Sequence, residues 1–234
     1  MNIRRVSILS ACAVGVVGCA NGDRVKSGVK HPNIVIINLD DAGLGDFSYL
    51  GALGYKTPNI DAMAKGGLTL SNFYAVQPIS GASRCGLMTG CYPNRVGFAY
   101  APNPNSPIGL HADEVTMAEL LKQNDYATAI YGKWHLGDAE QFLPLQNGFD
   151  DYYGLPYSND MWPFHPQYDF PDIPLLEGNK VLGYNTDQSE LTTEYTKRTV
   201  EFIRENGDNP FFVYLAHSMP HVPLAVSDKF KGKS

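Results

Sequence analysis

Asn33-Ile-Val-Ile-Ile-Asn-Leu39, followed directly by Asp40-Asp41, is the stretch that decides the fold class of this chain. A run of β-branched apolar residues is typical of a strand that is buried on both faces of a sheet. Three further apolar runs predict strands, and these lie at residues 68–76, 126–131 and 210–216. The sequence therefore predicts a sheet whose first strand ends in two carboxylates.

Helices are expected between these strands. Residues 58–65 have Thr57 at the N-cap and Pro58 at the first helical position, which is a common way to begin a helix. Further helices are expected at residues 83–89, 114–123 and 189–205, and long loops rich in Pro, Gly and Asn at residues 138–188. Strands that alternate with helices predict an α/β fold with a mostly parallel central sheet flanked by helices.

Reactive side chains follow three of the predicted strands. The first strand leads into Asp40-Asp41, the strand at 126–131 into Lys133, and the last into His217 and His221. In open parallel sheets, sites gather at the carboxyl ends of the strands. We therefore expect these side chains to meet at one edge of the sheet.

The composition is that of a globular protein and excludes some functions. The 234 residues are 44% hydrophobic and 12% aromatic, which is enough for a substantial core. The net charge is −6, and the sequence has no basic stripe or Arg/Lys cluster. No nucleic-acid partner is expected from such a charge pattern.

The N-terminus is typical of an export signal. Arg4-Arg5 precede a short apolar run at residues 6–17, and Val16-Val17-Gly18-Cys19 looks like a bacterial lipobox. This pattern predicts cleavage before Cys19, lipid on its sulfur, and a membrane-anchored lipoprotein in the periplasm or on the cell surface. The alternative is a plain secretory signal with an incidental Cys. Residues 19–31 are polar and read as a tether.

The cysteines agree with an exported protein. Of four Cys, Cys12 lies in the signal and Cys19 is the lipidation candidate. Cys85 and Cys91 remain, and their six-residue separation near a helix start is awkward for a disulfide. Both are expected to be small buried residues.

Ser80-Gly-Ala-Ser-Arg84, with Leu87-Met-Thr-Gly90 after it, carries the strongest family signal in the chain. It resembles the modification and nucleophile motif of the type I sulfatases. Other segments resemble the same family in the same order, namely Pro32–Asp41, Gly132-Lys-Trp-His-Leu-Gly137, Leu155-Pro-Tyr-Ser-Asn-Asp160 and Pro220-His-Val-Pro223. The Cys91-Tyr-Pro-Asn-Arg-Val96 segment and the Tyr-Ser-Asn-Asp loop look like those of arylsulfatase A and galactosamine-6-sulfatase relatives.

The resemblance implies an alkaline-phosphatase-like sandwich and a formylglycine made by oxidation of Ser80, whose hydrated aldehyde attacks the sulfur of a sulfate ester. It also implies a divalent cation held by Asp40, Asp41 and the modified Ser80. Carboxylate oxygens suit calcium, with magnesium possible, rather than a soft metal.

The resemblance gives each remaining motif residue a role. Arg84 would hold the nucleophile and metal site, and Lys133 would offer a positive charge to a sulfate oxygen. His135 would contact the nucleophile oxygen, and Ser158 would donate a hydrogen bond to the nucleophile or sulfate. His221 would bind a sulfate oxygen or protonate the leaving oxygen.

Two departures from the family pattern have consequences. Ser80 stands where Cys is commoner, which implies maturation by a radical enzyme of the anaerobic type. The family is also considerably longer, so residues 32–234 are expected to be a sulfatase catalytic domain that is incomplete at its C-terminus. Its expected substrate is a sulfated carbohydrate or an aryl sulfate.

Two alternatives remain open from the sequence. One is a phosphatase or phosphodiesterase of the same superfamily, with an unmodified Ser or Thr and two zinc ions. The other is a lipoprotein that binds sulfated glycans with an inactive site. Trp134, Trp162 and Tyr157 are candidates for a sugar platform in any of these readings, although most such aromatic residues belong to the core.

Overall fold

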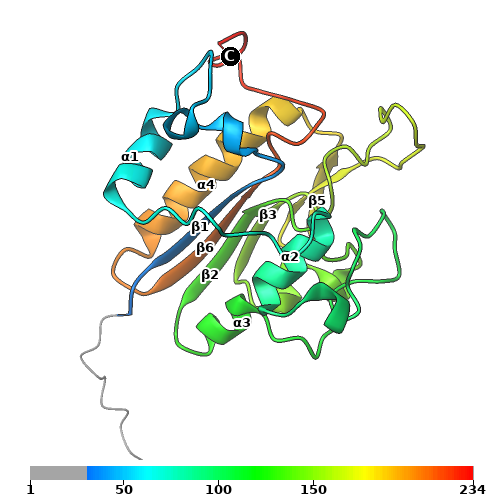
Figure 1. Ribbon diagram of the computed structural model, residues 1–234. Coiled ribbons are helices and arrows are strands. Elements are labelled where there is room, and N and C mark those ends of the chain that lie inside the picture. The colour runs from blue at the N-terminus through cyan, green and yellow to red at the C-terminus, as the bar shows by residue number, and fades with distance from the viewer. Residues whose placement is uncertain (1–30, 234) are drawn as a thin grey trace, which may run out of the picture. The chain divides into compact units, whose positions relative to one another are not determined.

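The central sheet has six strands in the order β1-β6-β2-β3-β4-β5 (Figure 1). The computed structural model describes residues 31–233. The strands are β1 (Ile34–Leu39), β2 (Ala127–Gly132), β3 (Asp151–Gly154), β4 (Pro174–Glu177), β5 (Lys180–Tyr184) and β6 (Phe211–His217). The first four strands in the sheet order are mutually parallel. Strand β4 runs antiparallel to β3, and β5 runs antiparallel to β4. The predicted mostly parallel sheet is confirmed.

Four α-helices accompany the sheet among the described residues. They are α1 (Pro58–Gly66), α2 (Ser80–Thr89), α3 (Met117–Lys122) and α4 (Leu191–Glu205), joined by short 3₁₀ turns. Helix α2 begins at Ser80, three residues earlier than expected. It ends where Gly90 adopts a left-handed conformation (φ 68°), which glycine reaches without a steric penalty.

Helices cover both faces of the central strands (Figure 1). Side chains of β6 alternate between the faces, as the two-residue period of a strand requires. Phe212 and Tyr214 pack in the cluster that includes Met88 of α2, whereas Val213 packs in the cluster that includes Tyr195 of α4. All seven residues of β6 are buried. This is why the strand is continuously apolar.

Strand β1 differs from the expectation that both of its faces are buried. Ile34 and Ile36 pack against the cluster beneath α2, but Val35 and Ile37 are 44% and 50% exposed. The reason is its place in the sheet. It pairs only with β6, and α4 packs on β6 and β2. One face of this edge strand is therefore only partly covered in the part of the chain that the structure describes.

Two other sequence predictions are wrong. Residues 68–76 form turns and loops rather than a strand, and their apolar members Leu68, Leu70 and Phe73 are exposed. Residues 138–188 are not all loop, because they contain β3, β4 and β5. These strands have only four or five residues each. They form because they pair with neighbouring strands, and no long apolar run marks them in the sequence.

The two cysteines within the described region are both free. Cys85 is buried and Cys91 is exposed, so the expectation of burial fails for Cys91, which follows the end of α2. The predicted signal peptide (residues 1–18) and nearly all of the tether (residues 19–31), including Cys19, lie outside the described residues. Among residues 31–233, no helix combines the length and apolar character needed to cross a bilayer.

Candidate active site

Side chains from three loops meet at the carboxyl edge of the sheet. Asp40 follows β1 and is only 6% exposed, and Lys133 follows β2 and is completely buried. Lys133 Nζ donates to Asp40 Oδ2 at 2.5 Å and to Ser158 Oγ at 3.0 Å. Residues distant in sequence are thus brought together because parallel strands end at the same edge.

Arg84 of α2 joins this group to Ser80. Arg84 Nε donates to Ser80 Oγ at 3.1 Å, and Nη2 lies 3.4 Å from Asp40 Oδ1. The four-residue spacing places Ser80 and Arg84 on one face of the helix. A single network therefore runs from Ser80 through Arg84, Asp40 and Lys133 to Ser158.

Buried charge dominates the electrostatics of this network. Burial would raise the pKa of Asp40, but the Arg84 and Lys133 cations outweigh it and hold the pKa below its ordinary value. For Lys133, burial and the Arg84 guanidinium lower the pKa to about 8, against the opposing pull of Asp40. With two cations around one carboxylate, the charged network carries a net positive charge and is suited to an anion.

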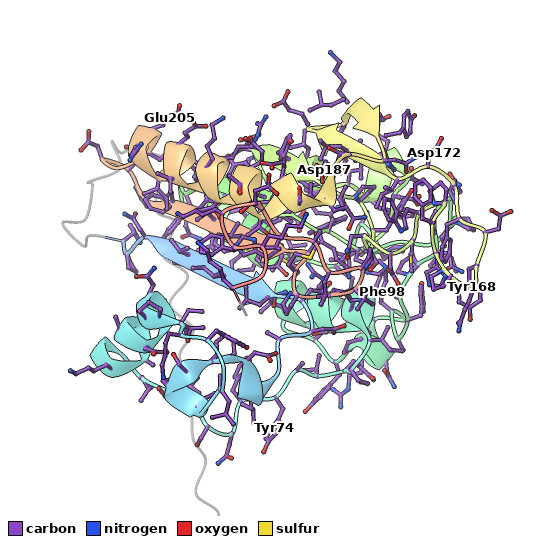
Figure 2. All side chains as sticks on the ribbon, turned by 90° about the horizontal axis from the view of Figure 1, so that it is seen from above. Tyr74, Phe98, Tyr168, Asp172, Asp187 and Glu205 are labelled. Atoms are coloured by element: carbon purple, nitrogen blue, oxygen red, sulfur yellow. The ribbon has the colours of Figure 1, made fainter. Side chains whose placement is uncertain are left out.

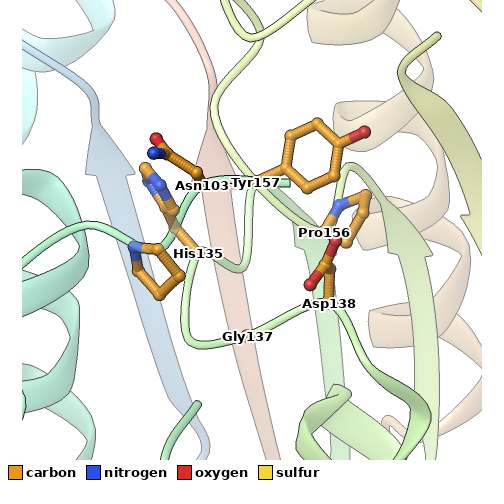
Figure 3. A pocket seen from close by; sticks show the side chains of 7 residues that line it. Asn103, His135, Gly137, Asp138, Pro156 and Tyr157 are labelled. Atoms are coloured by element: carbon orange, nitrogen blue, oxygen red, sulfur yellow. The ribbon is translucent and has the colours of Figure 1, made fainter. Parts of the chain in front are cut away.

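His135 follows Lys133 by two residues and lines a small separate space. It is buried and lines this space with Asn103, Gly137, Asp138 and Tyr157 (Figure 3). Burial lowers its pKa well below the ordinary histidine value, and the Lys133 and Arg84 charges lower it further. The ring is therefore neutral near pH 7.

Asp41 is the exposed member of the site, and the partly buried His221 lies beside it. The Asp41 side chain is 65% exposed, and its Oδ2 lies 3.7 Å from His221 Nε2. Asp41 has a positive φ of 62°, which is uncommon for a residue other than glycine.

The structure thus joins five of the predicted residues directly and places the others around them. Ser80, Arg84, Asp40, Lys133 and Ser158 share hydrogen bonds or ion pairs, whereas Asp41, His135 and His221 do not enter this network.

Sequence reasoning missed one member of the network, Tyr214. Arg84 Nη1 donates to its hydroxyl at 3.3 Å and to the backbone carbonyl oxygen of Lys133 at 2.5 Å. The alternation of side chains along β6 was the available signal, since it assigns Tyr214 to the face covered by α2.

Among the described residues, the expected metal ligands Asp40 and Asp41 do not by themselves make a complete metal site. Residues 31–233 contain no group of three or more His, Cys, Asp or Glu side chains placed to hold a metal ion. Asp40 and Asp41 are adjacent hard oxygen donors at a strand end, which fits calcium or magnesium in kind. Calcium takes about six to eight oxygen ligands, so two carboxylates and Ser80 would supply only some of them.

Comparison of the sequence with known protein families shows to which family the chain belongs. The Sulfatase family matches residues 32–234. The chain belongs to the sulfatase family. One relative of this sulfatase is the N-acetylgalactosamine-6-sulfatase of Sus scrofa. The two sequences are 35% identical over a region that covers 97% of this chain and 45% of the relative. The chain thus spans about half the length of the curated sulfatases it matches.

Solved structures share the fold of this sulfatase chain. Ps i-CgsB in complex with k-i-k-neocarrahexaose is 35% identical, with a TM-score of 0.72 over 83% of this chain and 46% of that one. A protein in complex with its substrate D-glucosamine-2-N,6-O-disulfate is 29% identical, with a TM-score of 0.64 over 82% of this chain and 35% of that one. The expected alkaline-phosphatase-like fold class is confirmed.

Proposed function

We propose that this sulfatase-family protein hydrolyses sulfate esters at the carboxyl edge of its sheet. The observation that carries the proposal is the hydrogen-bonded network in which Arg84 links Ser80 to a buried Asp40–Lys133 pair. Ser80 is also the first residue of α2, where free backbone N–H groups favour an anion.

The residues of the network have separate tasks in this proposal. Lys133 and Arg84 would hold the sulfate oxygens and stabilise the negative charge that grows on them. Ser158, held by Lys133 Nζ, would orient the sulfate with its hydroxyl. His221 is partly exposed and would deliver a proton to the leaving oxygen. The neutral ring of His135 would act as a hydrogen-bonding group for the nucleophile rather than as a charge.

Two groups absent from the encoded sequence belong to this proposal. Sulfatases generally use a formylglycine and a divalent metal ion, and Ser80 would be the precursor of the first. A formylglycine supplies a hydrated aldehyde as the nucleophile in place of a poorly nucleophilic serine hydroxyl. Asp40 and Asp41 would hold the metal, which is calcium or magnesium, and its charge would favour a deprotonated nucleophile.

The substrate class proposed is a sulfated carbohydrate, with simple aryl sulfates as further substrates. The support comes from relatives, because one is named for N-acetylgalactosamine 6-sulfate and two related structures hold a carrageenan oligosaccharide and a sulfated glucosamine. The phosphatase and glycan-binding alternatives are not favoured by these relatives.

We also propose the division of the chain made from the sequence. Residues 1–18 would be a lipoprotein signal, residues 19–31 a tether from lipid on Cys19, and residues 32–234 the catalytic part. The protein would then be exported and anchored at a membrane surface. A Cys19→Ala variant should remain uncleaved and unlipidated, as measured by the mass of the protein in the membrane fraction.

The decisive experiment for the function is the mass of the tryptic peptide that spans residues 66–84. The chain is produced together with a maturase of the anaerobic type, and the peptide is analysed with and without an aldehyde-reactive reagent. We expect the loss of two hydrogen atoms at Ser80 and reactivity toward the reagent.

The same peptide contains the control. Ser83 must stay unmodified, and a Ser80→Ala variant must show neither the mass change nor the reactivity. An unmodified Ser80, obtained with a maturase that converts a known sulfatase peptide in parallel, would overturn the formylglycine proposal.

A further inference from the structure

A second recess adjoins the candidate active site and has no role in the network described above. It has a volume of about 220 Å³, and its walls include Asp160, Trp162, Phe164, His165 and Val222. We infer that this recess, called here the aromatic pocket, binds the ring of a neutral sugar next to the sulfate-bearing residue. The inference rests on the proposed function for the identity of the neighbouring site.

Aromatic side chains form the apolar wall of the pocket. The rings of Trp162 and Phe164 meet edge to face with their centroids 4.8 Å apart, and Phe164 is 70% exposed. Tyr168 lies against His165 and belongs to a loop far from Glu205 at the end of α4 (Figure 2). Exposed aromatic faces offer the flat apolar surface on which the C–H face of a sugar ring packs.

Polar groups in the pocket supply one acceptor and one donor. Asp160 lines the pocket with a side chain that is 26% exposed, and its carboxylate supplies the acceptor. His165 Nδ1 accepts from the backbone N–H groups of Gln167 and Tyr168, which leaves the ring proton on Nε2. That nitrogen lies 3.9 Å from Asp160 Oδ2. A carboxylate beside an N–H donor is suited to sugar hydroxyl groups.

The pocket and the cationic network are neighbours. Asp160 of the pocket lies two residues after Ser158, whose hydroxyl accepts a hydrogen bond from Lys133 Nζ at 3.0 Å. On the other side, Val222 of the pocket follows His221 directly in sequence. A saccharide whose sulfate sits at Lys133 therefore extends into the pocket with its next ring.

Charge and size decide which ring the pocket accepts. The Asp160 carboxylate repels a second sulfate group, so the ring that occupies the pocket is uncharged near this carboxylate. The volume of about 220 Å³ is below the range typical of sites for drug-sized ligands, which favours one sugar ring rather than several.

Tryptophan fluorescence can test the inference without any enzymatic turnover. The chain has two tryptophans, Trp134 is completely buried, and Trp162 lines the pocket. The probe is a chemically desulfated neocarratetraose, titrated into the full chain. We expect saturable quenching of fluorescence, and about a tenfold loss of affinity for Phe164→Ala measured in the same way.

Matched variants separate the pocket from general effects on the fold. Phe73→Ala removes an aromatic side chain that is 73% exposed and outside the pocket, and it should leave the affinity unchanged. Variants of Trp162 remove the fluorescent residue of the pocket, so their affinity is measured by calorimetry. Trp162→Phe should bind the probe more tightly than Trp162→Ala, because it keeps an aromatic ring. Asp160→Asn should improve binding of the fully sulfated tetrasaccharide relative to the desulfated one.

The possible results distinguish this inference from the proposed function. Binding of the desulfated probe that weakens in Phe164→Ala but not in Phe73→Ala supports the pocket, even if Ser80 is never converted. Absence of binding, or equal affinity in both variants, overturns the pocket even if Ser80 is converted and sulfate esters are hydrolysed.

Discussion

Arg84 is the side chain through which Ser80 is connected to the buried charges of the site. It is 2% exposed and reaches Ser80, Asp40, Tyr214 and the backbone of Lys133. No shorter or monodentate cation can make the same contacts, because only a guanidinium presents donors in several fixed directions.

We predict that Arg84→Met destabilises the fold by about 3 kcal/mol or more, since it leaves Asp40 with one cation and a buried carbonyl without its donor. The free energy of unfolding from urea denaturation at neutral pH measures the effect. The control is Lys122→Ala, which breaks an exposed ion pair with Asp150 and should cost no more than about 1 kcal/mol. Equal losses in the two variants would show that the buried pair has no special weight.

His217 makes the free energy of unfolding depend on pH. It is 7% exposed, and burial lowers its pKa to about 4, below the ordinary histidine value. The unfolded chain therefore binds a proton at a higher pH than the folded chain does. This contribution to stability is complete above the unfolded pKa and is lost as the pH falls toward the folded one.

The expected loss from His217 between about pH 7 and pH 5 is about 2 kcal/mol. A His217→Asn variant cannot titrate in this range and should lose correspondingly less stability over the same interval. Urea denaturation of both proteins at the two pH values gives the comparison. A pH dependence that is unchanged in the variant would show that other groups cause it.

At the scale of elements, close contacts between strand ends set the geometry of the edge on which the site lies. A Cβ atom on Gly154, the last residue of β3, would overlap the carbonyl oxygen of Gly132, the last residue of β2. The loop after β2 carries Lys133, and the loop after β3 carries Ser158. The spacing of these two strands therefore fixes the distance between the two side chains.

Gly154→Ala should accordingly force β2 and β3 apart and destabilise the protein by about 3 kcal/mol. Thermal unfolding followed by circular dichroism measures this loss. Gly183→Ala in β5 is the matched control, because the added Cβ meets no atom within 4 Å. A Gly154→Ala protein as stable as the Gly183→Ala protein would contradict the close packing of the strand ends.

At the scale of the whole unit 32–234, the order of the strands predicts where the structure opens first. Strand β6 lies between β1 and β2 and is buried throughout, whereas β5 is at an edge of the sheet and four of its five residues are exposed. Local opening is easiest where few apolar contacts and neighbouring strands resist it.

Hydrogen exchange followed by mass spectrometry should therefore show protection of the β6 amides that exceeds that of the β5 amides by about a hundredfold or more. Peptides from α4, which packs on β6, should be nearly as protected as β6 itself. Exchange of β6 as fast as that of β5 would mean that the two helical layers do not hold the central strands.

The sequence by itself determined the parts of this protein that depend on local pattern. The apolar runs predicted β1, β2 and β6. The motif residues Ser80 and Lys133 pointed to the family and to the edge of the sheet where the candidate site lies. Such features are readable because a strand buried in a parallel sheet needs a continuous apolar run, and a motif keeps chemical groups at fixed spacing.

Only the tertiary structure decided which segments pair, which side chains are buried and where the aromatic pocket forms. Residues 68–76 are apolar but have no partner strand, while β3 is short and exists because β2 lies beside it. In the same way, packing brings the Tyr214 hydroxyl to Arg84. Packing also buries Trp134 in the core and leaves Trp162 in the wall of the aromatic pocket. Pairing, burial and pocket formation depend on contacts between residues far apart in the chain, and the free energy of those contacts exists only once the sheet has assembled.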